Sequence, residues 1–262
     1  LGGGGFIATF GSSSSYNGLQ ISLNRRMSDL TVGVNYTWSK TLGTDTDFQF
    51  AGNFVDHRKA DYGLLTYDRT QSLVVNYIYN VPRIARDGSA LAHPVFKAVL
   101  NGWEVSGITS LTSGAPQVVA QTTAQSDVGR YAVQGVGATT LNRRITGSEG
   151  WSPRPLITCN PNLSGGSRTL GAFIDTSCFA PAGKGSLGME SAVRPFRGPG
   201  VNNWDLSLYK KIPVGGSEDR YFQLRFETYN AWNHTQWNAF ANNPTFANDG
   251  TGRITNLSSL VG

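Results

Sequence analysis

Two cysteines are the residues whose chemistry is most readily inferred from this sequence of 262 residues. Cys159 and Cys178 lie in one stretch rich in Pro, Gly and Ser. Their even number, and the lack of a histidine or second cysteine at the spacing of a zinc site, favour a disulfide over a metal site. The alternative is two unpaired loop thiols. A disulfide would stabilise the fold by about 3 kcal/mol in the chain-entropy model and would indicate an oxidising, extracytoplasmic compartment.

Other residues that could catalyse a reaction or bind a metal are scattered. The histidines are His57, His93 and His234, and none has a second histidine three or four residues away. Asp45, Asp47 and Asp56 could suggest calcium, but the pair Asp45 and Asp47 lacks the continuation of an EF-hand loop. The sequence contains no G-x-S-x-G elbow, and its run of glycines at 2–5 lacks the Lys-Ser/Thr of a P-loop. We therefore expect no enzyme activity, no metal and no cofactor.

The composition excludes several further classes of protein. Charged residues make up only 15% and aromatic residues 11%, which argues against a disordered chain and a coiled coil. No run of apolar residues is long enough for a transmembrane helix. The net charge is +5, but the basic residues occur as isolated pairs such as Arg25-Arg26 and Lys210-Lys211. We expect no nucleic-acid binding, because that function needs basic residues gathered on one face.

Apolar and polar residues alternate with a period of two, which is typical of β-strands with one apolar face. In 16–26, Leu19, Ile21 and Leu23 alternate with polar residues, and 30–38 continues the pattern after a short break. The pattern recurs in 70–81, 102–114, 203–212, 220–232 and 252–257. The sequence therefore predicts an all-β fold of about seven antiparallel, up-and-down strands and no convincing helix.

The predicted strands have features of an outer-membrane barrel. Several are long enough, at about 9–11 residues, to cross a bilayer at a tilt. Gln223, Arg225 and Glu227 share a polar face and are predicted to line the lumen. Aromatic residues cluster near strand ends, where a girdle would lie, at Tyr36, Trp38, Tyr77, Tyr79, Trp103, Trp204, Tyr229 and Trp232.

The connections between predicted strands alternate in length, as expected for short periplasmic turns and longer extracellular loops. The longest, 113–202, has little periodicity and is interpreted as a long loop region inserted between strands. The connection at 81–101 is long for a turn and fits the rule less well. We interpret 1–262 as a single part of a barrel.

The order of several segments resembles the C-terminal barrel portion of TonB-dependent outer-membrane receptors. The resemblance is greatest to the subfamily with an N-terminal carboxypeptidase-regulatory-like domain. It rests on SSYNGLQISLNRR, GVNYTWSKTL, YDRTQSLVVNYIYNVP, NGWEVSGITSLTSGAPQ, DTSCFAPA, RGPGVNNWDLSLYKKIP, FQLRFETYNAWNHTQWNAF and GRIT. The resemblance implies an outer-membrane transporter whose plug and TonB-contacting segment lie upstream. Large transporters of this kind have about 22 strands, so we expect this chain to be truncated at both ends.

Three functions remain open from the sequence. The first is a non-enzymatic barrel fragment of a TonB-dependent transporter in the bacterial outer membrane, with lipid as its partner and TonB reached only through upstream parts. The second is an extracellular filament or tube, in which open strand edges pair with copies of the same chain. The third is a soluble all-β binding module, whose apolar faces would pack against each other.

Overall fold

The computed structural model describes most of the predicted strands. The described residues are 12–44, 62–118, 154–164, 167–168, 173–181, 194–214, 217–237, 239–240 and 260–261. The predicted strand at 252–257 lies outside them.

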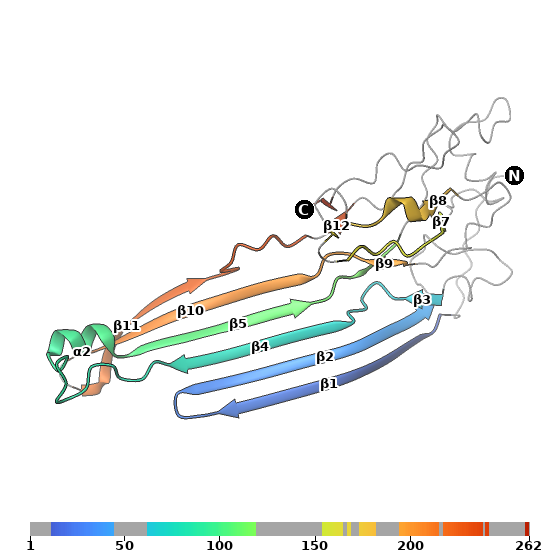
Figure 1. The fold of residues 1–262 in the computed structure, drawn as a ribbon. Helices are drawn as coiled ribbons and strands as arrows, with labels where there is room; N and C mark the ends of the chain where they lie inside the picture. Colours follow the sequence, from blue (N-terminus) through green and yellow to red (C-terminus); the bar gives the residue numbers. More distant parts are fainter. Residues whose placement is uncertain are drawn as a thin grey trace, which may run out of the picture.

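One antiparallel sheet dominates the fold (Figure 1). Its strand order is β1-β2-β4-β5-β10-β11, so each long strand pairs with the next long strand along the chain. The short strand β3 (Tyr62–Leu64) pairs with the end of β2 and is the seventh member. The long strands are β1 (Ser14–Arg26), β2 (Leu30–Thr44), β4 (Gln71–Asn80), β5 (Trp103–Thr112), β10 (Val201–Val214) and β11 (Ser217–Thr228). The predicted up-and-down, all-β architecture is confirmed.

The remaining elements are short and lie in the connections. Three two-stranded sheets pair β6 with β9, β7 with β8, and β12 with β13. Their bounds are β6 (Pro116–Gln117), β7 (Leu156–Ile157), β8 (Phe179–Ala180), β9 (Phe196–Arg197), β12 (Ala239–Phe240) and β13 (Leu260–Val261), and a 3-10 turn, η4, spans Thr176–Cys178. Four of these strands and η4 therefore belong to the stretch between β5 and β10.

The prediction of no helix was wrong, because the connection between β4 and β5 contains α2 (Pro94–Leu100). The Nδ1 atom of His93 accepts a hydrogen bond from Val95 N, and Pro94 occupies the first turn. Gly102, with φ of +79°, follows the helix and allows the chain to turn into β5. Seven residues make too few turns for a helical period to stand out in the sequence.

The two ends of the sheet differ. At one end the connections are the turn at 27–29, the segment with α2 and the short link between β10 and β11. At the other end lie the connections that include β3 and β6 to β9 (Figure 1). We call these the α2 end and the loop end.

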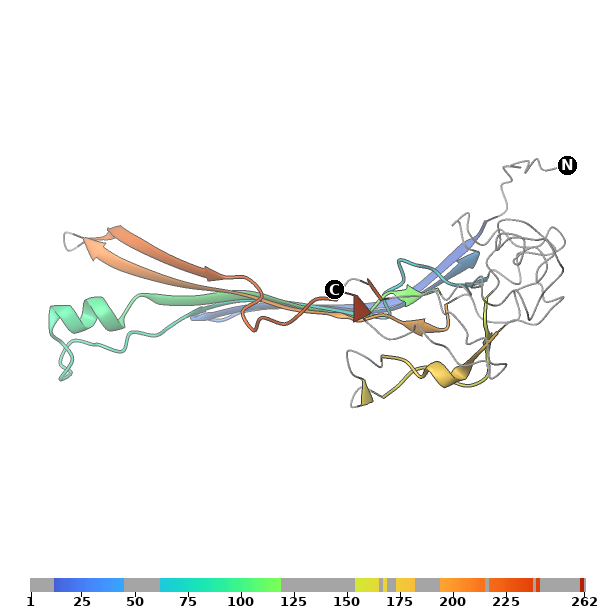
Figure 2. The same cartoon turned by 90° about the horizontal axis from the view of Figure 1, so that it is seen from above.

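The main sheet is a single layer (Figure 2). The hydrophobic cluster of buried residues lies instead in the loop-end segments, at Ile174, Cys178, Phe179 and Phe196. Apolar side chains of the sheet stay largely exposed, including 59% of Leu23, 69% of Phe222 and 65% of Phe226. The core of this chain therefore does not lie between two packed sheets in its described part, as it would in a soluble sandwich.

Candidate functional site

Strand register joins the apolar residues of the six long strands into one continuous surface, which we call the apolar face. Tyr36 on β2 pairs with Leu73 on β4, and Leu73 pairs with Leu111 on β5. Side chains of directly paired residues lie on the same side of a sheet. The same relation adds Leu19, Ile21 and Leu23 on β1, Leu206 and Leu208 on β10, and Leu224 and Phe226 on β11. An apolar surface this extensive requires a nonpolar partner, because its exposure to water is unfavourable.

The opposite surface, which we call the polar face, carries hydroxyl, amide and charged groups. Ser22 Oγ donates to Asn35 Oδ1 across β1 and β2 at 2.8 Å. Gly33 on this face lies so close to Asn24 and Asn76 that an added Cβ would be 2.5 Å from Asn76 Oδ1. Apolar residues, among them Val74, Ile78 and Ile108, interrupt the polar pattern of this face.

Charged residues on the polar face concentrate on β10, β11 and the start of β5. Lys211 Nζ lies 3.8 Å from Glu104 Oε2, and Arg225 forms an ion pair with Glu227. The Arg225 guanidinium also lies 5.3 Å from the centre of the Tyr209 ring. We call these two ion pairs and the ring contact the charged network, and their charges require an aqueous or polar environment.

The structure places the three residues predicted to line a lumen on this polar face. Gln223 pairs with Lys211, Arg225 with Tyr209, and Glu227 with Ser207. Their apolar neighbours Leu224 and Phe226 belong to the other face, because successive strand residues point to opposite sides. The three residues therefore share one face with the charged network.

The residues predicted to form an aromatic girdle separate into two groups at the two ends of the sheet. Tyr79 and Trp103 lie at the α2 end, with Tyr77 one step further in. Trp38, Trp204, Tyr229 and Trp232 lie toward the loop end, and Tyr36 lies two residues from Trp38. The rings of Trp204 and Trp232 meet edge to face, with centroids 6.4 Å apart.

The length of the sheet suits a bilayer. The central strand β5 has ten residues, which corresponds to about 34 Å at roughly 3.4 Å per residue. A tilt of about 40° reduces this to roughly 26 Å along the membrane normal, close to the apolar band of about 25 Å in outer-membrane barrels.

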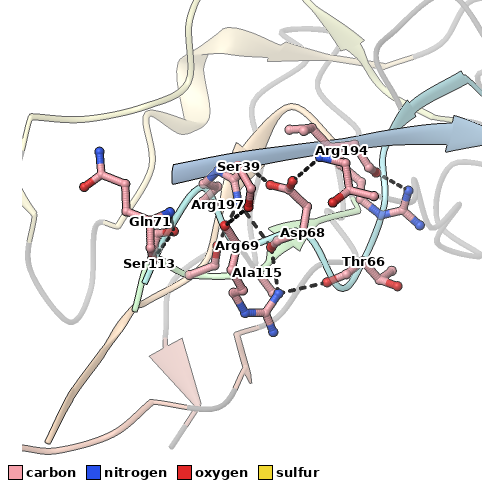
Figure 3. Close-up of polar contacts among 12 residues, drawn as sticks. Ser39, Thr66, Asp68, Arg69, Gln71, Ser113, Ala115, Arg194 and Arg197 are labelled. Atoms are coloured by element: carbon pink, nitrogen blue, oxygen red, sulfur yellow. Dashed lines mark hydrogen bonds and ion pairs between the residues drawn. The ribbon is translucent and has the colours of Figure 1, made fainter. Parts of the chain in front are cut away.

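A buried carboxylate organises the loop end of the sheet (Figure 3). Asp68 is completely buried; its Oδ1 accepts a hydrogen bond from Thr41 N, and its Oδ2 forms an ion pair with Arg197. Arg197 also donates to Gly114 O at 3.1 Å. Asp68 thus connects β2, the β3–β4 link, the end of β5 and β9, and we call this set of contacts the Asp68 node.

Two further arginines donate hydrogen bonds to backbone carbonyl groups at the link between β3 and β4. Arg194 donates from Nη1 to Leu64 O at 2.7 Å, and Arg69 donates to Thr66 O at 3.1 Å. Ser39 Oγ on β2 donates to Arg69 O at 3.0 Å. Residues 64–69 are therefore held by side chains of β2 and of the segment around β9, although 129 positions separate Asp68 from Arg197. Nothing in the spacing of the sequence indicated this pairing, so it was not predicted.

The comparison with protein families decides the class of this sheet. A family model described as an outer membrane beta barrel domain matches residues 5–260. The chain belongs to this family. A search of curated proteins found no match, and a search of solved structures found none either.

Membership of the outer membrane beta barrel family predicts the environment of each face. In such barrels the outward face is apolar and contacts lipid, while the interior is polar. For this sheet the same arrangement predicts that the apolar face contacts lipid and that the polar face is directed to the barrel interior. In the described part of the chain no helix is both long and apolar enough to span a membrane.

Cys159 and Cys178 form a disulfide in a loop-end segment of this barrel domain, with a Cα–Cα distance of 4.9 Å. Cys178 is buried beside Phe179, and the Phe179 ring meets Phe196 edge to face at 6.4 Å. Because Phe196 directly precedes Arg197, the disulfide segment is connected with the Asp68 node.

Asp175 shapes the turn that leads into the disulfide. Its Oδ1 accepts hydrogen bonds from Ser177 N at 3.0 Å and Ser177 Oγ at 2.6 Å. These bonds favour the ionised carboxylate and lower the pKa of Asp175 below its ordinary value of 3.8.

The other residues considered for chemistry do not form a site among the described residues. His93 caps α2, and His234 N donates to Asn230 Oδ1 in the turn after β11. His57, Asp45, Asp47 and Asp56 lie outside the described residues. Across the described ranges, no group of three or more His, Cys, Asp or Glu residues is placed to hold a metal ion.

Proposed function

We propose that this chain supplies part of the wall of a TonB-dependent transporter in the outer membrane and performs no catalysis itself. The observation that carries the proposal is the strand register, which separates an apolar from a polar face over six consecutive long strands. Gln223, Arg225 and Glu227 would face the lumen, and the connections of the loop end would face the outside. A plug and the TonB-contacting segment would come from upstream parts of the same polypeptide.

The shape of the sheet favours a wide barrel. In Figure 2 the strands overlie one another in a thin layer over the middle of the sheet, so curvature across this middle part is weak, while β10 and β11 diverge from β4 and β5 toward the α2 end. Barrel diameter grows with strand number, and barrels of about 22 strands enclose a plugged lumen. The outer edges of β1 and β11 would pair with further strands of that barrel.

A bulky solute imported or exported under the control of a plug is the cargo that suits such a lumen. The part of the proposal that assigns the transporter to the TonB-dependent class rests on sequence resemblance. Segments such as those around β4, β5 and β11 resemble TonB-dependent receptors. The charged network beside Arg225 and Glu227 would offer polar contacts to the plug, to water or to the cargo.

Thiol labelling in cells tests the transport proposal. Both native cysteines are in the disulfide, so a cysteine introduced at Gln223 or Leu224 is the one free thiol of this chain. We expect Gln223→Cys to react with a small charged maleimide at a rate that changes when the proton gradient is collapsed or TonB is deleted. The physical reason is that an energised plug would open and close access to the lumen, and so change how often the maleimide reaches the thiol.

Leu224→Cys is the matched control, because it is adjacent in sequence but on the apolar face. It should remain unreactive under every condition. If Gln223→Cys reacts at one constant rate with and without TonB and the proton gradient, the barrel is a passive pore and the TonB proposal is wrong.

A further inference from the structure

The helix α2 lies at the α2 end of the sheet, beyond the ends of β4 and β5 (Figure 2). None of the seven side chains of Pro94–Leu100 is buried. Val95 is 60% exposed, Phe96 47% and Val99 55%. For a short helix in water this is an unfavourable arrangement, because apolar side chains normally provide the packing that stabilises a helix.

Two side chains of the apolar face hold α2 in place. Trp103 Nε1 donates to Val99 O at 2.8 Å, and the Lys210 ammonium donates to Asn101 O. Trp103 and Lys210 are paired in register, and Lys210 Nζ lies 5.0 Å from the centre of the Trp103 ring. The helix is therefore attached to the lipid-facing side of the sheet, directly beyond the aromatic group formed by Tyr79 and Trp103.

Asn101 fixes the rest of the connection against the helix. Its Oδ1 accepts a hydrogen bond from Ala85 N at 2.9 Å, and its Nδ2 donates to Ala85 O at 2.7 Å. Ala85 is buried by these contacts, whereas Ile84 beside it is exposed. The connection thus has a defined, hydrogen-bonded structure, and its exposed side chains include Ile84 and the apolar residues of α2.

Basic residues predominate among the charged residues of this connection. Arg83, Arg86 and Lys97 belong to the same connection, and Asp87 is its one acidic residue. Lys97 forms an ion pair with Asp87. The ion pair and the nearby Arg83 lower the pKa of Asp87 below its ordinary value of 3.8. The connection therefore carries a net charge of +2 at neutral pH, from three basic groups and one acidic group.

We propose that α2 is an interfacial helix, with Val95, Phe96 and Val99 inserted at the boundary between headgroups and acyl chains of the adjacent leaflet. Two observations favour lipid as the occupant: the helix is attached to the apolar face of the sheet, and the net positive charge of its connection complements phosphate headgroups. Helices of this kind lie in the membrane plane with the apolar face buried by about 5–10 Å. The inference rests on the proposed membrane-spanning role of the sheet.

Nitroxide labels on single cysteines test this inference in the full chain reconstituted into vesicles of phosphatidylcholine and phosphatidylglycerol. The labelled positions are Val95 and Val99 on α2, Leu208 on the apolar face as the membrane reference, and Ala90 as an exposed control on the same connection. Collision rates with oxygen, which concentrates in lipid, are compared with those of a water-soluble nickel chelate. We expect the oxygen-to-nickel ratio at Val95 and Val99 to exceed that at Ala90 several-fold.

The reference position separates the two ways in which the experiment can fail. If Leu208 shows a lipid-like ratio but Val95 and Val99 match Ala90, α2 is exposed to water and the inference is overturned, while the barrel remains. If Leu208 also matches Ala90, the sheet does not face lipid and the proposed function fails with it. A ratio at Val95 and Val99 that rises with the phosphatidylglycerol content supports the role of the basic residues.

Discussion

Replacing Asp68 by alanine is expected to lower the free energy of unfolding by about 2–4 kcal/mol. The carboxylate is completely buried, and its removal leaves Thr41 N without its acceptor and Arg197 without its counter-charge. Breaking one side of a buried pair costs about 3–5 kcal/mol. The Arg197 side chain is 26% exposed, so water reaches part of the guanidinium and the expected cost lies toward or below the low end of that range.

Guanidinium chloride titration in detergent micelles measures this change. Asp68→Asn should cost less than Asp68→Ala, because the amide oxygen still accepts from Thr41 N. Asp87→Asn is the matched control: it removes a carboxylate from an ion pair at the surface, and exposed pairs contribute about 0–1 kcal/mol. If Asp68→Ala and Asp87→Asn had equal effects, the Asp68 node would not hold the loop end together.

Arginine at Leu206 is expected to destabilise the inserted barrel by about 2–4 kcal/mol. Leu206 pairs with Gly107 and with Thr228 on the apolar face, about midway between the two aromatic groups. A guanidinium at that depth loses its hydration, and Arg or Lys on the lipid face near the midplane costs about this amount. Folding titrations into lipid vesicles provide the measurement.

Ser207→Arg is the control for the substitution at Leu206. Ser207 is adjacent in sequence and lies on the polar face, where its Oγ is 3.5 Å from Glu227 Oε1. A guanidinium there gains a carboxylate neighbour and keeps its water, so we expect a change below about 1 kcal/mol. Equal destabilisation by both substitutions would show that both faces have the same environment, contrary to the assignment of lipid and lumen.

Local alternation made the sheet predictable. In strands such as β10, Trp204, Leu206 and Leu208 alternate with polar residues, and a period of two determines which side chains share a face. Register could not be derived from the pattern alone, but a slip of one residue would transfer apolar side chains to the polar face. The pairing of Leu208 with Val105 and Phe226 is the register that avoids this.

The Asp68 node and α2 depend on information that the sequence pattern does not contain. Asp68 and Arg197 meet only because the segment between β5 and β10 returns to the β3–β4 link, and no period connects the two positions. In α2, the apolar residues Val95, Phe96 and Val99 span little more than one turn, so they do not stand out from a loop. The cap at His93 and the turn at Gly102 were the local signals that could have indicated this helix.

The central claim is that alternate residues of the long strands face lipid and lumen, and a cysteine scan along β10 tests it most directly. A fluorophore is attached at each position from Trp204 to Lys211 in turn, and the full chain is reconstituted into vesicles that contain brominated lipid. We expect strong quenching at Trp204, Leu206 and Leu208 and weak quenching at Ser207, Tyr209 and Lys211. Quenching that is uniform, or that changes smoothly along the strand without alternation, would contradict a two-faced membrane wall.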